Sequence, residues 1–323
     1  MDERNSRVVS SVVQKMSFKA ISRGGLFMDS NKGSPCDDIP HYCITLYQKK
    51  SNIVCLMDLS TLVAQVREVA ISVGAFLREQ RAAFDRSAVQ EKGPHDYVSY
   101  VDKASEERLV KALSALLPEA GFITEEKTTG QYAGEEYCWV IDPLDGTTNF
   151  IHDMAPYCVS IALRSQTELL LGVVYEVCRD ECYWAYKGGG AYMNDHPIHV
   201  TDIASMGQAQ ILLGFPYDSE RFRPVVLGLI RQMYGTVGAE RLLGSAAVEL
   251  CYVAAGRAEA RIEGLLGPWD VAAGCLILSE AGGRVTDFSG GDTYLAGREV
   301  LASNGLLHEQ LLQVVETALA VGC

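Results

Sequence analysis

The sequence predicts a protein of the layered α/β class. Segments rich in β-branched and aromatic residues, which favour strands, alternate along the chain with segments whose apolar residues recur at helical spacing. Alternating strands and amphipathic helices are typical of sheets whose faces are covered by helices. The chain has 323 residues, which is enough for one large domain or two small ones.

The first part of the chain differs in character from the rest. Residues 1–56 show no sustained hydrophobic period and include a stretch rich in Gly, Pro, Ser and Asp. Because the pattern changes at Met57, we expect residues 57–323 to form the folded domain and residues 1–56 to be an N-terminal extension of unknown role. Two interpretations of the extension stay open here: a genuine segment, or an over-long reading frame with Met57 as the true start.

Two helices are predicted at the start of the domain. Asp58 or Ser60 can cap the first of them. Its apolar residues recur on one face: Leu62, Val66, Val69, Val73 and Phe76 or Leu77. The second helix begins at about Ala104 and is stopped by Pro118.

The later elements are mainly strands at first. The segments CWVID, CVSIALR, ELLLGVVYEV and ECYWAY favour strands, and KGGG at 187–190 is typical of a hairpin loop. Helical patterns return at Ala246–Ala258 and Val271–Ala281. A strand at REVLASN and a helix over 307–320 complete the predicted order.

The charge balance limits the class of partner. The chain has 28 Lys and Arg against 41 Asp and Glu, a net charge of −13. Nucleic acid is therefore not expected as the main partner, because binding to phosphates needs clustered basic residues. No stretch reaches the roughly 18 to 20 uninterrupted apolar residues of a membrane helix, so we expect no membrane association.

The cysteine usage indicates a reducing compartment. There are 10 cysteines, none in a C-x-x-C pair, and some, such as Cys158 and Cys275, lie inside apolar runs. This usage fits reduced, buried thiols, so we expect a cytoplasmic protein. Cys178 and Cys182 have no partners at zinc spacing, so we expect no zinc site.

The segment WVIDPLDGTTNFIH, residues 139–152, places Asp142 and Asp145 at the end of an apolar run. One interpretation is a simple turn, because Asp-Pro-x-Asp-Gly is favourable turn chemistry. Other carboxylates also stand next to apolar elements: Asp102, Glu125, Glu126 and Asp270. If these side chains converge, they repel one another, and a bound Mg²⁺ relieves that repulsion.

The turn that follows, Gly146-Thr147-Thr148, suits an anion. Glycine allows the backbone to approach a ligand closely, and a helix that starts there offers free N–H groups. Carboxylates that hold a metal beside N–H groups that hold a phosphate indicate phosphoryl transfer. The chain has no G-x-x-x-x-G-K-[ST] and no G-x-G-x-x-G, so nucleoside triphosphate chemistry has little support.

Two long segments, WVIDPLDGTTNFIH and PWDVAAGCLILSEAGG, resemble the two signatures of the inositol monophosphatase family. These are Mg²⁺-dependent, lithium-sensitive phosphatases, and the resemblance extends from about Met57 to the end of the chain. It implies alternating α-β-α-β-α layers of the inositol monophosphatase and fructose bisphosphatase type. It also implies two or three Mg²⁺ per subunit, a homodimer and inhibition by lithium.

The resemblance implies roles for the matching acidic residues. The first metal would be held by Glu125, Asp142 and the carbonyl of Leu144, and the second by Asp142, Asp145 and Asp270. Glu126 would help a third, looser metal or its waters. Thr147 and Glu125 would orient the attacking water, and Asp102 would pair with Thr147.

The same resemblance implies substrate contacts. The phosphate would lie against the backbone N–H groups of Gly146 and Thr147, beside Asp145. Glu263 would accept hydrogen bonds from substrate hydroxyls, and Ala246 would line the sugar pocket. Lys92 resembles the lysine of a mobile loop near the metals. Simpler interpretations remain for three of these residues: a surface acid for Glu263, packing for Ala246 and a solvated lysine for Lys92.

The implied reaction is hydrolysis of a phosphate monoester by a metal-activated water, without a covalent enzyme intermediate. Relatives that act on 3′-phosphonucleotides tend to have Lys after the first Thr of the signature, whereas this chain has Thr148-Asn149. Together with Glu263, this favours myo-inositol-1-phosphate as the substrate. Fructose 1,6-bisphosphate, a 3′-phosphonucleotide, and a role as a protein-binding regulator that keeps the fold remain as alternatives.

Overall fold

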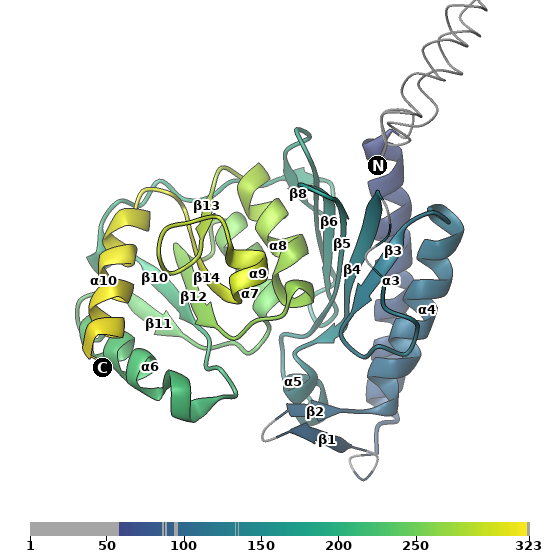
Figure 1. Ribbon diagram of the computed structural model, residues 1–323, viewed down its shortest axis with the longest axis horizontal. Coiled ribbons are helices and arrows are strands. Elements are labelled where there is room, and N and C mark those ends of the chain that lie inside the picture. Colours follow the sequence, from purple (N-terminus) through teal and green to yellow (C-terminus); the bar gives the residue numbers. More distant parts are fainter. Residues whose placement is uncertain are drawn as a thin grey trace, which may run out of the picture. The chain divides into compact units, whose positions relative to one another are not determined.

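The computed structural model describes residues 58–85, 87, 89–93, 96–132, 134 and 136–321. The predicted extension, residues 1–56, lies outside the described residues. In the described domain, helices and sheets alternate in layers, in the order helices, sheet, helices, sheet, helices (Figure 1). This arrangement confirms the predicted α-β-α-β-α layers.

The larger sheet has seven strands in the order β3-β4-β5-β6-β7-β8-β9. Their bounds are β3 Gly121–Thr124, β4 Tyr137–Asp145, β5 Cys158–Ser165, β6 Leu169–Glu176, β7 Glu181–Tyr186, β8 Ala191–Met193 and β9 His196–Pro197. Strand β3 is parallel to β4, and every later pair is antiparallel. All nine residues of β4 are buried, as expected for a central strand covered on both faces.

Two long helices, α3 (Leu59–Ala82) and α4 (Tyr100–Leu116), cover one face of this sheet (Figure 1). The Asp58 carboxylate accepts a hydrogen bond from the Ser60 N–H at 3.0 Å, which makes it the predicted cap of α3. Helix α4 begins at Tyr100 rather than at the predicted Ala104. Ser99 and Asp102 form a capping box that starts the helix four residues earlier.

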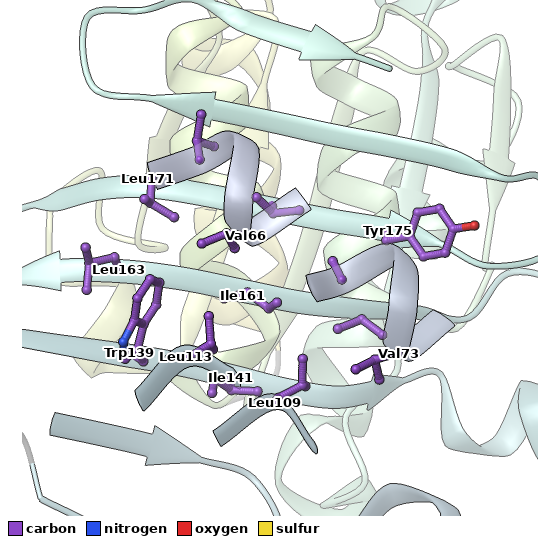
Figure 2. Packing of buried hydrophobic residues seen from close by; sticks show 14 of the residues in the cluster. Val66, Val73, Leu109, Leu113, Trp139, Ile141, Ile161, Leu163, Leu171 and Tyr175 are labelled. Carbon is purple, nitrogen blue, oxygen red and sulfur yellow. The ribbon is translucent and has the colours of Figure 1, made fainter. Parts of the chain in front are cut away.

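The interior between these helices and the sheet is apolar and well packed. Figure 2 shows its members: Val66 and Val73 of α3, Leu109 and Leu113 of α4, Trp139 and Ile141 of β4, Ile161 and Leu163 of β5, and Leu171 and Tyr175 of β6. Burying one such side chain stabilises the fold by roughly 1.5 to 3 kcal/mol. This packing therefore holds β4, the strand that ends in the signature carboxylates, in a fixed position.

Helix α3 is long and apolar enough, by length and composition alone, to cross a membrane. A core helix of a folded domain passes the same test. The face that was predicted from the apolar spacing is the face buried against the sheet: Leu62, Val63, Val66, Ala70, Val73, Gly74 and Leu77.

The smaller sheet has five strands in the order β11-β10-β12-β14-β13. Their bounds are β10 Gln210–Leu213, β11 Ala239–Arg241, β12 Ala260–Gly264, β13 Arg284–Thr286 and β14 Glu299–Ser303. Helices α7 (Ala246–Ala254) and α8 (Pro268–Glu280) lie between the two sheets (Figure 1). Helices α6 (Ser219–Met233) and α10 (His308–Val321) pack on the outer side. Short elements complete the domain: β1 Gln90–Gly93, β2 Asp96–Val98, α5 Thr147–His152, η2 Met206–Gln208 and α9 Tyr294–Gly297.

Some predicted boundaries were wrong. Helix α7 ends at Ala254 rather than Ala258, and helix α8 begins at Pro268 rather than Val271. Proline suits the first turn of a helix because the N–H that it lacks has no partner there. The short strands β10 to β13 were not predicted, because runs of three to five residues carry too little periodicity.

Candidate active site

A bulge in strand β4 brings Asp142 and Asp145 to the same side of the sheet. Asp142 pairs with Ser160 and Asp145 pairs with Cys158, so β4 has one more residue than β5 between these two pairs. In a regular strand, residues three positions apart point to opposite faces. The extra residue reverses that relation and directs both carboxylates the same way.

Gly146 makes the turn that follows the strand. Its φ of 90° is in the left-handed region, which glycine adopts without steric cost. A Cβ at this position would lie 2.9 Å from the Pro156 carbonyl oxygen. Helix α5 begins at the next residue, Thr147. The anion-binding interpretation of the sequence needs a helix start here, because free N–H groups at a helix start can bind an anion.

Thr147 is held by two acceptors. Its hydroxyl lies 3.0 Å from Asp102 Oδ1 and 3.0 Å from the Leu144 carbonyl oxygen. Asp102 is buried, and its other oxygen accepts hydrogen bonds from the Ser99 N–H and hydroxyl. The predicted pairing of Asp102 with Thr147 is therefore present. Because the one proton of the Thr147 hydroxyl is directed to one or the other of these oxygens, its lone pairs are free to accept a hydrogen bond.

Asp142 and Asp270 share an unfavourable electrostatic environment. Burial raises the pKa of both carboxyls well above the usual range, and repulsion from Glu125 raises both pKa values further. One oxygen of each is bound to backbone: Asp142 Oδ1 accepts from Leu144 N–H at 3.0 Å, and Asp270 Oδ2 accepts from Gly267 N–H at 2.6 Å. Asp270 is thus a helix cap and a cavity residue at once.

Asp145 is bound to the start of helix α7. Its Oδ2 accepts from the Ser245 hydroxyl and from Ala247 N–H, both at 2.7 Å, and its Oδ1 accepts from Ala246 N–H at 3.3 Å. Burial raises the pKa of Asp145, and the hydrogen bond from Ser245 opposes that rise. Sequence reasoning missed Ser245, although a serine directly before an apolar helical run is a signal for a helix start.

A cavity of about 380 Å³ collects most of the predicted site. Its lining includes the predicted residues Glu125, Asp142, Leu144, Asp145, Gly146, Thr147, Ala246, Glu263 and Asp270. Residues from widely separated parts of the sequence therefore meet at one place.

Among the predicted residues whose side chains the structure describes, two do not line the cavity. Asp102 lies behind Thr147, to which it is hydrogen-bonded. Glu126 follows Glu125, and its N–H donates to Glu106 Oε2 at 2.7 Å. Lys92 lies on strand β1 of the β1–β2 hairpin, and its side chain is outside what the structure describes.

The donor set of the cavity fits a hard divalent cation. It offers carboxylate and carbonyl oxygens, which Mg²⁺ prefers, and repulsion from Glu125 adds to the burial that raises the pKa values of Asp142 and Asp270. Among the described residues, no three His, Cys, Asp or Glu side chains are already arranged as a metal-binding cluster. The reason is local: Asp145 faces helix α7, and Asp142 and Asp270 each hold a backbone N–H.

The opposite wall of the cavity is built from the smaller sheet. Glu263 lies on β12 beside Arg261, and Arg261 also contacts Glu249 of α7. Gly214 makes room for this arrangement, because a Cβ there would lie 1.9 Å from the Glu263 carboxylate. Sequence reasoning found Glu263 but missed Arg261, although a charged pair at i and i+2 of an apolar strand indicates one shared polar face.

Comparison with known proteins agrees with this arrangement. The profile of the inositol monophosphatase family matches residues 58–320. An inositol-1-monophosphatase of Mesorhizobium japonicum is 37% identical over 264 residues, which cover 82% of this chain and 99% of that protein. A fructose-1,6-bisphosphatase/inositol-1-monophosphatase of Aquifex aeolicus is 38% identical, covering 82% of this chain and 98% of that protein. The Nus factor SuhB of Pasteurella multocida is 37% identical, covering 71% of this chain and 86% of that protein.

Solved structures share the fold. The extragenic suppressor protein suhB of Bartonella henselae superposes with a TM-score of 0.75 at 34% identity, covering 79% of this chain and 98% of that one. An inositol monophosphatase of Thermotoga maritima gives a TM-score of 0.74 at 31% identity, covering 80% of this chain and 98% of that one.

The fold and the cavity define a phosphatase of small phosphorylated substrates, of a kind that depends on metal ions. More particularly, the chain belongs to the inositol monophosphatase family. The names of its relatives differ, however, so family membership alone does not fix the substrate.

Proposed function

We propose that this protein is a Mg²⁺-dependent phosphatase that hydrolyses inositol monophosphate, with myo-inositol-1-phosphate as its substrate. The observation that carries the proposal is the composition of the cavity. One wall gathers the buried carboxylates Asp142 and Asp270, and the other presents Glu263 and Arg261, which can hydrogen-bond a polyhydroxylated alcohol. A phosphate monoester of a polyol matches both walls.

The metal-holding residues are proposed to be Glu125, Asp142, Asp145 and Asp270, with the Leu144 carbonyl. When bound there, Mg²⁺ supplies a Lewis acid that lowers the pKa of water and neutralises charge on the phosphoryl oxygens. We propose two or three ions per subunit, with Glu126 assisting the loosest of them.

The attacking water is oriented by Thr147 in this proposal. Because the single proton of the Thr147 hydroxyl is directed to Asp102 or to the Leu144 carbonyl, the hydroxyl oxygen offers a lone pair, to which the water can donate one of its protons. By accepting the hydroxyl proton, Asp102 sets the direction of the Thr147 lone pair that accepts the hydrogen bond from the water. The water then attacks the phosphorus in line with the leaving oxygen, and no enzyme side chain becomes phosphorylated.

The phosphate and the alcohol have separate binding regions. The backbone N–H groups of Gly146 and Thr147 stand at the start of α5, where they can donate to phosphate oxygens. Glu263 accepts from hydroxyls of the alcohol, and Ala246 lies on the same wall. Lys92 was expected on a loop but lies on strand β1, and its proposed place near the metals rests on the family resemblance alone.

Phosphate release with Mg²⁺ from a substrate panel tests the proposal. The panel contains myo-inositol-1-phosphate, fructose 1,6-bisphosphate and a 3′-phosphonucleotide, and the first should give the highest kcat/KM. Mutation of a residue that only supports a metal ligand typically lowers activity roughly 10- to 100-fold. Asp142→Asn changes a proposed ligand itself, so it should lower the activity by more than that. Asp195→Asn, in which the changed side chain is 86% exposed, is the matched control and should leave the activity unchanged.

Three outcomes would change or refute the proposal. A higher kcat/KM for fructose 1,6-bisphosphate would favour the activity in the name of the Aquifex aeolicus relative. Full activity of Asp142→Asn would refute the metal assignment. If the wild type releases no phosphate from any substrate, a binding role of the kind suggested by the name Nus factor becomes the better proposal.

Three further properties are proposed on the family resemblance and the cysteine usage. We propose a homodimer, which gel filtration at a dimer mass would support, and inhibition by lithium at about the family's usual sensitivity. We also propose a cytoplasmic location. Five of the six free cysteines among the described residues are buried, which is compatible with a reducing compartment.

A further inference from the structure

A buried group of three charges forms part of the cavity wall, and we call it the Arg261 triad: Arg261, Glu249 and Glu263. The side chains of Arg261 and Glu249 are each 1% exposed, and that of Glu263 is 15% exposed. Arg261 Nε donates to Glu249 Oε2 at 2.9 Å, and Arg261 Nη2 donates to Glu263 Oε2. Glu249 is held in turn by the Leu243 and Gly244 N–H groups at 2.8 and 3.1 Å.

One nitrogen of this guanidinium has no hydrogen-bond partner among the residues that the structure describes. Arg261 Nη1 is buried and makes no hydrogen bond, although Arg261 lines the cavity. A buried donor on a charged group is unfavourable when it is unpaired, and such groups in native proteins nearly always have a partner. The single N–H of Nε and one of the two N–H groups of Nη2 are used, so Nη1 is the nitrogen whose hydrogen bonds are left for an oxygen inside the cavity.

The net charge of the triad indicates which oxygen suits this donor. When Glu263 is ionised, as its pKa of about 7 allows above neutral pH, the one positive and two negative side chains have a formal charge of −1, and Asp145 adds further negative potential nearby. A second phosphate at this wall would therefore be repelled. A neutral hydroxyl is compatible, because its oxygen can accept from Nη1 while a neighbouring hydroxyl donates to Glu263.

We propose that Arg261 determines specificity for the alcohol part of the substrate. Its Nη1 donates to one hydroxyl oxygen of a neutral polyol, and its Nη2 holds Glu263 where that carboxylate accepts from an adjacent hydroxyl. The inference rests on the proposed function, because it concerns the leaving alcohol of the same substrate. It specifies the substrate class as monophosphates of polyols with adjacent free hydroxyls.

Two substrates separate this role from a structural one. Kinetics with Mg²⁺ are measured on myo-inositol-1-phosphate and on p-nitrophenyl phosphate, whose alcohol part has no hydroxyls. For Arg261→Met, kcat/KM on the inositol ester should fall roughly 10- to 100-fold, mainly through KM, which corresponds to one hydrogen bond from a charged donor. Activity on p-nitrophenyl phosphate should change less than about threefold, since it lacks that hydrogen bond.

Two further variants serve as controls. Arg261→Lys keeps the charge but has a single donor nitrogen, so it should recover only part of the lost kcat/KM. Arg257→Met removes another arginine that is ion-paired, to Glu181, but does not line the cavity. It should leave the ratio of the two kcat/KM values unchanged.

The possible results are decisive in either direction. An equal loss on both substrates would overturn the proposal in favour of a purely structural triad, and no loss on either would show that water alone satisfies Nη1. If the wild type hydrolyses neither ester, the proposed function itself fails, and that result is distinct from a failure of the Arg261 contact.

A second measurement covers the case in which Arg261→Met does not fold, because it leaves two buried carboxylates without their partner. Wild-type enzyme is then tested on inositol 1-phosphates that each lack one hydroxyl. Loss of at least about tenfold at two adjacent positions would support the proposal, because a site built to hydrogen-bond a hydroxyl strongly rejects the analogue without it. Equal kcat/KM across all deoxygenated esters would refute it.

Discussion

The seven-stranded sheet and the five-stranded sheet each supply one wall of the cavity, and the two walls are built differently. On the larger sheet, the bulge between Asp142 and Asp145 and the left-handed Gly146 position the site within one short segment. On the smaller sheet, Arg261 meets Glu249 of a different element, with no special backbone conformation at either residue.

This difference indicates how each wall responds to change. The wall on the larger sheet, which we propose to face the phosphate (the phosphate-facing wall), depends on backbone geometry, so a substitution there disturbs both the fold and the turn at Gly146. The wall on the smaller sheet, which we propose to face the alcohol (the alcohol-facing wall), depends on side chains that reach across elements. A substitution there is therefore expected to change the preferred alcohol while the phosphate end stays intact. Three measurements test this comparison, in order of decreasing expected effect.

The largest effect is expected for Gly146→Ala. A left-handed conformation for a residue with a Cβ costs roughly 1 to 2 kcal/mol, and crowding against the Pro156 carbonyl adds roughly 1 to 3 kcal/mol. The unfolding free energy should therefore fall by about 2 to 5 kcal/mol by these two estimates. Since the turn itself shifts, kcat should fall by about a hundredfold, as a displacement of about 1 Å can cause.

Gly188→Ala is the matched control, measured by the same denaturant titration. Gly188 also has a positive φ, of 76°, but a Cβ there would meet nothing within 4 Å. It should lose only the roughly 1 to 2 kcal/mol of the conformational term and keep full activity. Equal losses in the two variants would show that crowding at the catalytic turn is unimportant.

An intermediate effect is expected for Ser245→Ala, which removes one of the contacts that join the two walls. Asp145 would lose the hydroxyl at 2.7 Å but keep the Ala247 N–H at 2.7 Å. We expect kcat/KM to fall, or the Mg²⁺ needed for half-maximal activity to rise, by roughly 10-fold, the low end for an outer-shell partner.

The control for this variant is Ser289→Ala, which removes a similar serine–aspartate hydrogen bond of 2.6 Å to Asp287, outside the cavity lining. It should leave the Mg²⁺ dependence unchanged. A normal Mg²⁺ response in Ser245→Ala would mean that the start of helix α7 does not position Asp145 for its role.

The smallest effect at neutral pH belongs to the five-stranded sheet alone, because it appears only on acidification. Burial lowers the pKa of His308 to about 4, with a smaller contribution from Arg284. The ring lies 2.9 Å from the Thr286 hydroxyl and 2.8 Å from the Ser303 hydroxyl. Because the folded protein holds this ring neutral, its contribution to stability is complete above pH about 6.5 and is lost as pH falls toward 4.

The pH dependence of the unfolding free energy, compared between wild type and His308→Gln, checks this prediction. Glu263 contributes with the opposite sign: burial raises its pKa to about 7, so its stabilising contribution is present below the unfolded value and is lost as pH rises through 7. Because Glu263 is present in both proteins, the difference between their unfolding free energies at each pH reports the contribution of His308 alone. Parallel pH curves would show that His308 titrates alike in the folded and unfolded states.

Much of the fold was predictable because its signals are local. The apolar face of α3 and the strands β4 to β7 were predicted from residue spacing and composition. The start of α4 was placed too late because the cap at Ser99 is a contact between side chain and backbone. In the smaller sheet, β14 was predicted from the segment REVLASN, whereas β10 to β13 were missed because strands of three to five residues have no distinctive period.

The sequence by itself determined the phosphate-facing motif, including Asp142, Gly146 and Thr147. These residues are chain neighbours, and a strand end followed by a glycine turn has few possible geometries. Only the tertiary structure decided that Ser245, 100 residues from Asp145, would bind it, and that Arg261 would be buried with a donor left for the cavity. Such contacts depend on how whole layers pack against one another, and the spacing of neighbouring residues in the sequence does not encode which distant residues will meet.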